Sequence, residues 1–576
     1  MRLVLAVAAC GAFVVVGAAF LLGYPQYCRN FTAFAASSMD SAQQADLILT
    51  NGNIYTGDAT TPRAEALAIR GETIIAVGSA SEVRKTAGKS TIVIDLRGQF
   101  VMPGFNDAHV HIGEAGRAKL LVNLVGAASL PEFQRRIRES LPTHKPGTWI
   151  TGFGWDHTLW PQKQFPTRAD LDAVASDRPM FFKRVDGHVA VANSASLKIA
   201  GITRETPDPP GGHIEHDATT GEPNGILEED TAMALVAKLI PPPSAVDRMR
   251  GISLALADAA HDGVTSVQDN SAWDDFLVFQ ELRRAGGLPV RITEWLPFNK
   301  SVSELEELRR QGGTTDAWLK TGMLKGFLDG SLGSRTAALL APYSDDPSTS
   351  GILLMDSAAV ARMAVERDAA GFQIGFHAIG DHANRVALDA FAAVLKANGP
   401  RDRRDRIEHA QVIAPEDFPR FAELSVIASM QPSHETTDMR WAQDRLGAER
   451  SKGAYAWNTL QRGGVRLAFG TDYPIESINP MRGLHACVTR ALPDGTPAGG
   501  WQPQEKISIE DCIRAYTYGS AYVQFDETRK GVLAPGRLAD VVSLSQDVTG
   551  VPPGDILKTQ VEWTMTGGRF VYQRAK

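Results

Sequence analysis

The pattern of hydrophobic and polar positions divides the chain into three parts. Between residues 45 and 98, short strand-like runs such as ADLILT and TIIAVG are separated by Asn-Gly and Gly-Glu turns, which is typical of a small β module. From about 101 to 525, short apolar runs alternate with helical stretches, the pattern of parallel strands joined by helices. The tail returns to strands and turns, so we expect residues 45–100 and 526–576 to fold together into one β-sandwich domain.

The central part contains eight candidate strands. They are residues 99–111, 264–270, 290–298, 322–330, 372–381, 406–411, 425–432 and 465–474. Eight strands with intervening helices predict an α/β fold, a (β/α)8 barrel whose chemistry lies at the carboxyl ends of the strands. Residues 112–263, between the first two strands, are too many for a structureless loop and predict a large insertion over that face of the barrel.

The beginning of the chain differs from the body. After Arg2 the sequence is apolar from Leu3 to Gly23, about the length that spans a bilayer. A short basic start before an apolar run is typical of a secretory signal or an uncleaved anchor. We therefore interpret residues 1–36 as a signal peptide or N-terminal membrane anchor, and expect the body to be exported to a periplasmic or other extracytoplasmic location.

Composition excludes several classes of protein. The chain has 576 residues, of which 43% are hydrophobic and 22% charged, as expected for a globular protein of two or three domains. A net charge of −7 gives no reason to expect a nucleic-acid partner. Cys10 and Cys28 lie in the leader, and Cys487 and Cys512 form no Cys-x-x-Cys pair, which argues against thiolate metal sites and redox motifs.

Ionisable residues gather at the ends of the candidate strands. His109 and His111 close the first strand in GFNDAHVHIG, and both imidazoles would point the same way because residues i and i+2 share one face of a strand. His377, His409 and Asp472 lie in the fifth, sixth and eighth strands. If the barrel closes, these side chains converge near its axis, and such a set of imidazoles and a carboxylate suits a divalent ion such as zinc.

Lys325 lies within the fourth strand, in GMLKGFLDG. A lysine in an apolar barrel strand is costly unless it is paired or modified. Carboxylation by CO2 would turn it into an anionic oxygen ligand able to bridge two metal ions. The sequence leaves open whether the site holds one ion or two.

The chain from about residue 45 to 576 resembles the amidohydrolase superfamily, and within it the large-insertion branch called amidohydrolase family 3, which includes an N-substituted formamide deformylase. The motifs that carry the resemblance are MPGFNDAHVH, KGFLDGSLGSRTA, FHAIGDHANRVALDAF, RIEHAQ and GTDYPIESINPM. The resemblance implies a distorted, TIM-like, metal-dependent barrel with a β-sandwich built from both flanks. It also implies that His109, His111 and Asp472 hold the more buried ion, that His377 and His409 hold a second, and that carboxylated Lys325 bridges them.

The expected reaction follows from this ligand set. A metal-activated hydroxide would attack a carbonyl carbon while the metal polarises the carbonyl oxygen. Asp472 would take the proton of the attacking water and pass it to the leaving nitrogen, as general base and then general acid. We therefore predict hydrolysis of a C–N bond in a small amide, an N-substituted formamide or a cyclic amide.

Four further residues are candidates for contact with the substrate. Trp155 would form a pocket wall, although large aromatic residues pack into cores as often as they line pockets. His188, in VDGHVAV, would donate a hydrogen bond to the substrate carbonyl or oxyanion, as the resembled branch implies. Asp329 and Arg335 would orient Lys325 or bind substrate.

Other functions remain open from the sequence. The same fold could serve a deaminase or a hydrolase of esters or peptides, although Lys325 weighs against a single-metal deaminase. A non-catalytic envelope binding protein is a third class, and the six intact ligand positions weigh against it. The sequence leaves open whether the chain forms a homodimer.

Overall fold

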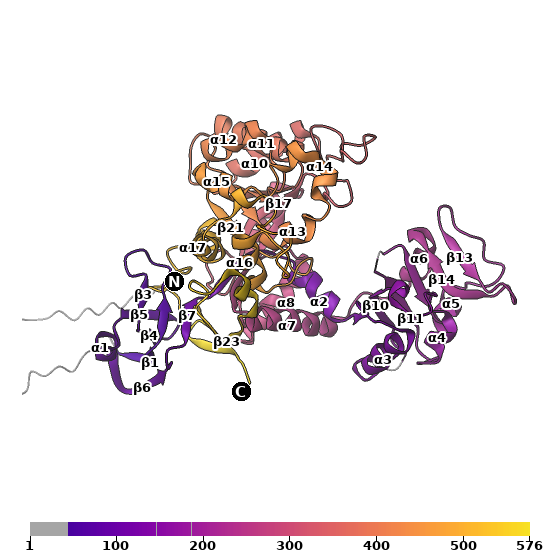
Figure 1. Ribbon diagram of the computed structural model, residues 1–576, viewed down its shortest axis with the longest axis horizontal. Helices are drawn as coiled ribbons and strands as arrows, with labels where there is room; N and C mark the ends of the chain where they lie inside the picture. Colours follow the sequence, from indigo (N-terminus) through magenta and orange to yellow (C-terminus); the bar gives the residue numbers. More distant parts are fainter. Residues whose placement is uncertain (1–43, 146, 186, 576) are drawn as a thin grey trace, which may run out of the picture. The chain divides into compact units, whose positions relative to one another are not determined.

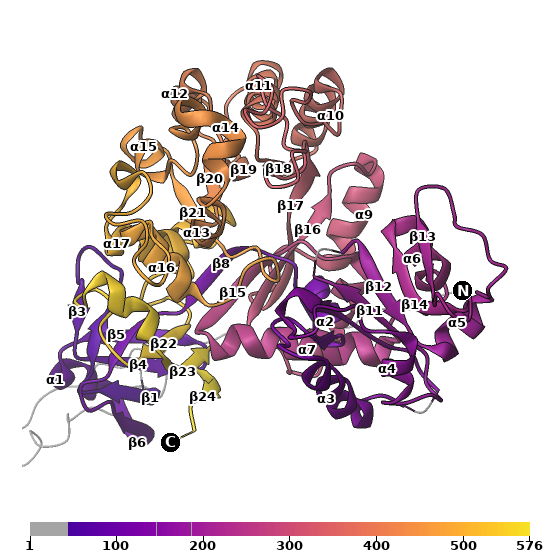
Figure 2. The same ribbon diagram turned by 45° about the vertical axis from the view of Figure 1, so that its right-hand side comes forward.

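The computed structural model describes residues 44–145, 147–185 and 187–575. Residues Ala45–Lys576 form one compact unit, which contains a parallel barrel, a two-sheet flank and an inserted domain (Figure 1, Figure 2). The predicted signal peptide or anchor, residues 1–36, lies outside the described residues. In the part of the chain that is described, no helix is both long enough and apolar enough to cross a membrane.

Eight parallel strands form the central sheet, in the order β21-β20-β19-β18-β17-β16-β15-β8. They are β8 (Phe105–Val110), β15 (Val264–Asp269), β16 (Arg291–Pro297), β17 (Leu319–Phe327), β18 (Ile374–Ala378), β19 (Arg406–His409), β20 (Ile427–Met430) and β21 (Leu467–Phe469). The first and last strands approach each other where Asp472 N donates to His109 O at 2.7 Å and His111 N donates to Tyr473 O at 2.8 Å. The predicted distorted (β/α)8 barrel is therefore confirmed.

Helices pack around the strands because each presents an apolar face to one large hydrophobic core. The main covering helices are α7 (Ala245–His261), α8 (Trp273–Arg284), α9 (Val302–Gly312), α10 (Ser357–Ala369), α11 (Asp381–Asn398), α12 (Phe418–Glu423), α15 (Trp457–Arg462), α16 (Pro480–Thr489) and α17 (Ile509–Arg514). Cys487 on α16 and Cys512 on α17 form a disulfide. Sequence spacing did not predict this bond, because the two cysteines are 25 residues apart and approach only when the helices pack.

The first predicted strand, residues 99–111, is two strands in the structure. β7 (Phe100–Pro103) belongs to a flank sheet and β8 to the barrel, with Gly104 between them. A Cβ on Gly104 would lie 2.3 Å from Thr265 Cγ2, so only glycine fits this junction. The barrel therefore begins at residue 105 rather than 101, because the chain passes directly from one sheet into the other.

Both flanks contribute to a β-sandwich, as predicted. One sheet contains β5 (Thr73–Gly78), β4 (Ala66–Arg70), β1 (Ala45–Thr50) and β6 (Ala87–Asp95). The other contains β24 (Arg569–Gln573), β23 (Val561–Thr566), β22 (Val541–Leu544), β7, β2 (Asn53–Tyr55) and β3 (Arg63–Ala64). Leu67, Val101 and Val541 are buried in one cluster, so residues from the two ends of the chain share a core.

The segment between β8 and β15 folds into a domain with its own sheet. The strand order is β13 (His213–His216), β14 (Pro223–Glu228), β12 (Val189–Ala192), β11 (Met180–Arg184), β10 (Ile150–Trp155) and β9 (Val122–Asn123). Helices α3 (Leu130–Ser140), α4 (Arg168–Asp172), α5 (Ser194–Ala200) and α6 (Glu229–Ala237) accompany it. Phe181 and Phe182 belong to different hydrophobic clusters, as strand alternation requires, so both faces of the sheet are covered.

One buried arginine connects the barrel to both flanks. Arg291, the first residue of β16, donates two hydrogen bonds to the Asp540 carboxylate, at 2.8 and 2.9 Å. Glu72 Oε2 lies 3.4 Å from the same guanidinium group. The Trp318 ring covers the guanidinium with a centroid distance of 4.4 Å. This set of contacts compensates a charge that would otherwise be buried without a partner.

Candidate metal centre

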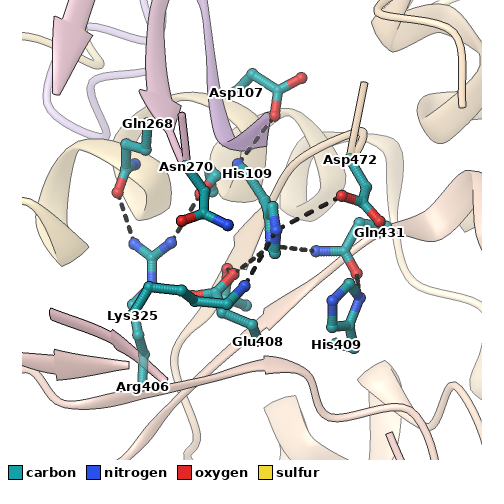
Figure 3. A network of polar contacts seen from close by, with 12 residues as sticks. Asp107, His109, Gln268, Asn270, Lys325, Arg406, Glu408, His409, Gln431 and Asp472 are labelled. Carbon is teal, nitrogen blue, oxygen red and sulfur yellow. Dashed lines mark hydrogen bonds and ion pairs between the residues drawn. The ribbon is translucent and has the colours of Figure 1, made fainter. Parts of the chain in front are cut away.

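The carboxyl ends of the barrel strands surround a cavity of about 480 Å³. All six predicted ligands line it: His109, His111, Lys325, His377, His409 and Asp472. Their convergence follows from barrel geometry, because side chains at the carboxyl ends of neighbouring parallel strands meet at one end of the sheet. Figure 3 shows part of this cluster, with dashed contacts from His109 to Glu408, Lys325, Gln431 and Asp472.

His109, His111 and Asp472 form the first group that could hold a metal ion. Asp472 Oδ1 lies 3.0 Å from His111 Nε2 and 3.5 Å from His109 Nε2. The other nitrogen of His111, Nδ1, is 3.1 Å from the Asn270 carbonyl oxygen. Both imidazoles therefore direct Nε2 toward one carboxylate oxygen, as the His-x-His spacing predicted.

The orientation of His109 is fixed by a buried carboxylate that the sequence analysis missed. His109 Nδ1 donates to Glu408 Oε2 at 2.6 Å, while Arg406 and Ser429 also donate to this carboxylate. Burial lowers the pKa of His109 to about 4. A neutral imidazole whose Nδ1–H is occupied offers a lone pair at Nε2, which is the usual arrangement of a metal-binding histidine. The signal for Glu408 is a charged residue inside the buried strand RIEH.

A second group that could hold an ion consists of His409, His434 and Asp472. His434 lies on α13 (Pro432–Asp438), and its Nε2 is 3.7 Å from Asp472 Oδ2. His434 was not among the predicted ligands, although it follows the seventh predicted strand by two residues. His434 Nε2 is buried without a hydrogen-bond partner among the described residues. Unpartnered buried ligand atoms fit a site for a cation.

Lys325 is buried in β17 with only 3% of its surface exposed. Its Nζ lies 3.3 Å from His109 Nε2 and 5.1 Å from the centroid of the Trp295 ring. Burial lowers the pKa of Lys325 to about 8. Within the described ranges it forms no ion pair with a carboxylate, so the predicted alternative in which Asp329 orients it is not seen.

Asp329 instead organises the backbone beside His377. Its carboxylate accepts hydrogen bonds from the backbone N–H groups of Ala338, Ile379 and Gly380, at 2.9, 3.0 and 2.8 Å. His377 Nε2 lies 3.5 Å from Asp329 Oδ1 and 3.1 Å from Gly330 O. The His377 and His409 rings are 4.5 Å apart, which brings the predicted second pair of histidines together.

None of the four predicted substrate contacts, Trp155, His188, Asp329 and Arg335, lines the cavity. Trp155 is fully buried in the core of the inserted domain, where its Nε1–H donates to Phe182 O at 2.9 Å, so its interpretation as a pocket wall is wrong. Arg335 forms an ion pair with Asp345 at 2.9 Å. The His188 side chain is 68% exposed and lies 3.0 Å from Glu229.

Other residues form the walls of the cavity. Phe327, Leu332, Trp441 and Ile475 are apolar and stand near the ligand cluster. Glu114, Asp438 and Glu476 add negative charge to the wall. A cavity with a few convergent polar groups and apolar walls is typical of an enzyme that binds a small molecule.

A (β/α)8 barrel with a histidine and aspartate cluster at the carboxyl ends of its strands defines a metal-dependent hydrolase. Comparison with known proteins identifies it further: residues 92–572 match the Amidohydrolase family, and the chain belongs to this family. The predicted membership is confirmed.

The alignments with individual relatives cover nearly the whole chain. Protein LONG AFTER FAR-RED 3 of Arabidopsis thaliana is 36% identical over 92% of this chain and 92% of its own length. N-substituted formamide deformylase of Arthrobacter pascens is 27% identical over 92% of this chain and 99% of its own. The crystal structure of an uncharacterized metal-dependent hydrolase from Pyrococcus furiosus matches with a TM-score of 0.71 and 32% identity, covering 87% of this chain and 99% of that one.

Proposed function

We propose that this protein hydrolyses the C–N bond of a small amide, an N-substituted formamide or a cyclic amide. The observation that carries the proposal is the group of His109, His111 and Asp472, whose ligand atoms lie within 4.8 Å of one another. Imidazole and carboxylate ligands favour zinc among the common divalent ions. The similarity to an N-substituted formamide deformylase supports the choice of bond.

The residues at the metal centre would have separate roles in hydrolysis. A divalent cation held by these ligands supplies Lewis-acid activation of water and of a carbonyl oxygen. Asp472 is the carboxylate positioned to accept the proton of the attacking water and return it to the leaving nitrogen. Burial opposes its ionisation, but His109 and His111 outweigh burial and hold the pKa of Asp472 well below its usual range. Asp472 is therefore ionised at neutral pH, which is the form that can bind a cation and act as a general base.

A substrate panel tests the reaction class. Purified full-length protein supplied with zinc would be incubated with N-benzylformamide, N-benzylacetamide, a cyclic imide, benzyl acetate and adenine. We expect amine release from at least one amide, loss of activity on chelation and recovery on adding zinc. Hydrolysis of the ester alone, or release of ammonia from adenine alone, would contradict the proposal.

Lys325 provides a test of how the metals are connected. We propose that its neutral amine adds to CO2, which forms an N–C bond and releases one proton, and that the resulting carboxylate bridges two ions next to His377 and His409. Lys325→Ala should lose activity and regain part of it with added propionate, which supplies the missing oxygens. Density at Nζ should show the added group.

Lys320 is the matched control, since it lies on the same strand and forms an ion pair with Asp526 at 2.8 Å. Activity of Lys320→Ala should not respond to propionate. An unmodified Lys325 ammonium, together with no rescue of Lys325→Ala, would show that the site has no carboxylated lysine.

We also propose that the protein is exported. The N-terminal sequence supports this, and so does the disulfide between Cys487 and Cys512, because disulfides persist mainly in oxidising compartments. Thiol titration under denaturing conditions shows whether the N-terminal leader has been cleaved. A cleaved, oxidised protein should show no thiol, whereas retention of Cys10 and Cys28 should give two. Reduced Cys487 and Cys512 in protein from the native host would contradict export.

A further inference from the structure

We propose that His434 is a ligand of a second divalent cation, held together with His409 and Asp472, so that Asp472 bridges two cations through its two oxygens. The inference rests on the proposed metal-dependent function. It adds to the predicted ligand set a residue that lies on a helix rather than on a barrel strand. It also assigns each oxygen of Asp472 to a different cation.

The two oxygens of Asp472 face different imidazoles. Oδ1 lies 3.0 Å from His111 Nε2 and 3.5 Å from His109 Nε2. Oδ2 lies 3.7 Å from His434 Nε2. A carboxylate between two sets of nitrogen ligands is arranged to hold one cation on each side. The ligand atoms of His409, His434 and Asp472 lie within 4.8 Å of one another, close enough to share the second cation.

His409 is oriented for this second position. Its Nδ1 is 2.8 Å from Gln431 Oε1, where it donates a hydrogen bond, and Nε2 is then the atom left to bind a cation. The His409 and His434 rings are nearly parallel, with an interplanar angle of 7° and centroids 6.0 Å apart. These two imidazoles and the Asp472 carboxylate are three donors of the kinds that bind zinc.

The position of His434 is fixed by the helix that carries it. Helix α13 begins at Pro432, directly after β20, and proline is favoured in the first turn because it has no N–H to leave unpaired. His434 and Asp438, four residues apart on α13, both line the metal cavity. Thr436 lines a different cavity and not this one. The helix therefore holds His434 toward the metal centre.

The burial of His434 argues for a partner at Nε2. The side chain is only 12% exposed, and Nε2 has no hydrogen-bond partner among the residues described. A buried polar atom without a partner destabilises the folded state. A cation bound between His434 and Asp472 would remove this penalty.

Metal titration of the full-length protein tests the proposal without measuring catalysis. Zinc would be titrated by equilibrium dialysis, and the bound metal counted by mass spectrometry. The parent should bind two equivalents. His434→Ala should keep the first and weaken the second by at least about tenfold, since loss of even a supporting residue of a metal site costs this much. Thr436→Ala, on the same helix but outside the metal cavity, should bind both as the parent does.

Manganese substitution provides an independent spectroscopic measurement. Two Mn²⁺ ions bridged by a carboxylate give an exchange-coupled electron paramagnetic resonance signal, and we expect it in the parent and in Thr436→Ala. His434→Ala should give the signal of an isolated ion. His434→Glu, which offers a carboxylate oxygen at a similar reach, should restore the coupled signal.

Three results would overturn the proposal. They are a single equivalent of metal in the parent, two equivalents of unchanged affinity in His434→Ala, and equal loss in His434→Ala and Thr436→Ala, which would indicate damage to the helix. None of these results decides whether the protein hydrolyses amides, which the substrate panel measures separately. Failure of the proposed function would instead appear as no hydrolysis of any amide by the zinc-loaded parent.

Discussion

Replacement of Asp472 by asparagine is expected to lower turnover by at least about a hundredfold, because loss of a general base typically costs 10²–10⁴ in rate. Asparagine keeps the size of the side chain and one oxygen ligand, but it cannot accept a proton at neutral pH. The ion beside His109 and His111 should be largely retained, since their Nε2 atoms and the remaining oxygen still face it. Substrate should still bind.

Metal content and turnover of Asp472→Asn are measured on the same preparation. A variant that retains metal but turns over slowly identifies Asp472 as the proton carrier. If Asp472→Asn with full metal turns over at nearly the parent rate, Asp472 is not the proton carrier, and another cavity residue such as His434 or Glu476 must take that role.

The double variant His109→Ala/His111→Ala is expected to lose the more buried ion and with it all measurable hydrolysis. Both imidazoles direct Nε2 to Asp472, so their removal leaves that carboxylate as the only member of the first group. Metal analysis should fall from roughly one or two equivalents by one full equivalent, given the affinity of zinc for imidazole ligands.

The control for this variant is His213→Ala/His216→Ala, which removes two histidines from strand β13 of the inserted domain. Its metal content and activity should equal those of the parent. Undiminished metal in His109→Ala/His111→Ala would disprove the assignment of the metal centre.

The barrel and most of its ligand cluster could be predicted because both follow from local patterns. Strand periodicity places His109 and His111 on one face, and parallel strands bring the ends of the fifth, sixth and eighth strands to the same edge. His434 could not be found in this way. It lies on a helix, and its approach to Asp472 depends on how the chain turns after β20, which strand periodicity does not specify.

Residues of the insertion were harder to interpret for a different reason. An aromatic residue such as Trp155 has the same sequence signature in a core as in a pocket, and only the folded domain shows that its Nε1–H is satisfied by Phe182 O. For Glu408 the difficulty was its partner rather than the residue itself. Its charge inside a buried strand was visible in the sequence, but its partner His109 is 299 residues away.

The contact between Arg291 and Asp540 has a consequence for the order in which the protein folds during synthesis. Arg291 begins the third barrel strand, yet its carboxylate partner lies 249 residues later in the chain. The Asp540 carboxylate also accepts the backbone N–H of Gly567 at 2.9 Å. Until these C-terminal residues have left the ribosome, the arginine lacks the carboxylate that accepts two of its hydrogen bonds, and burial of the start of that strand is unfavourable. We therefore expect nascent chains that end before residue 540 to remain protease-sensitive throughout the barrel, and native protection to arise only when the last strands of the sandwich are available.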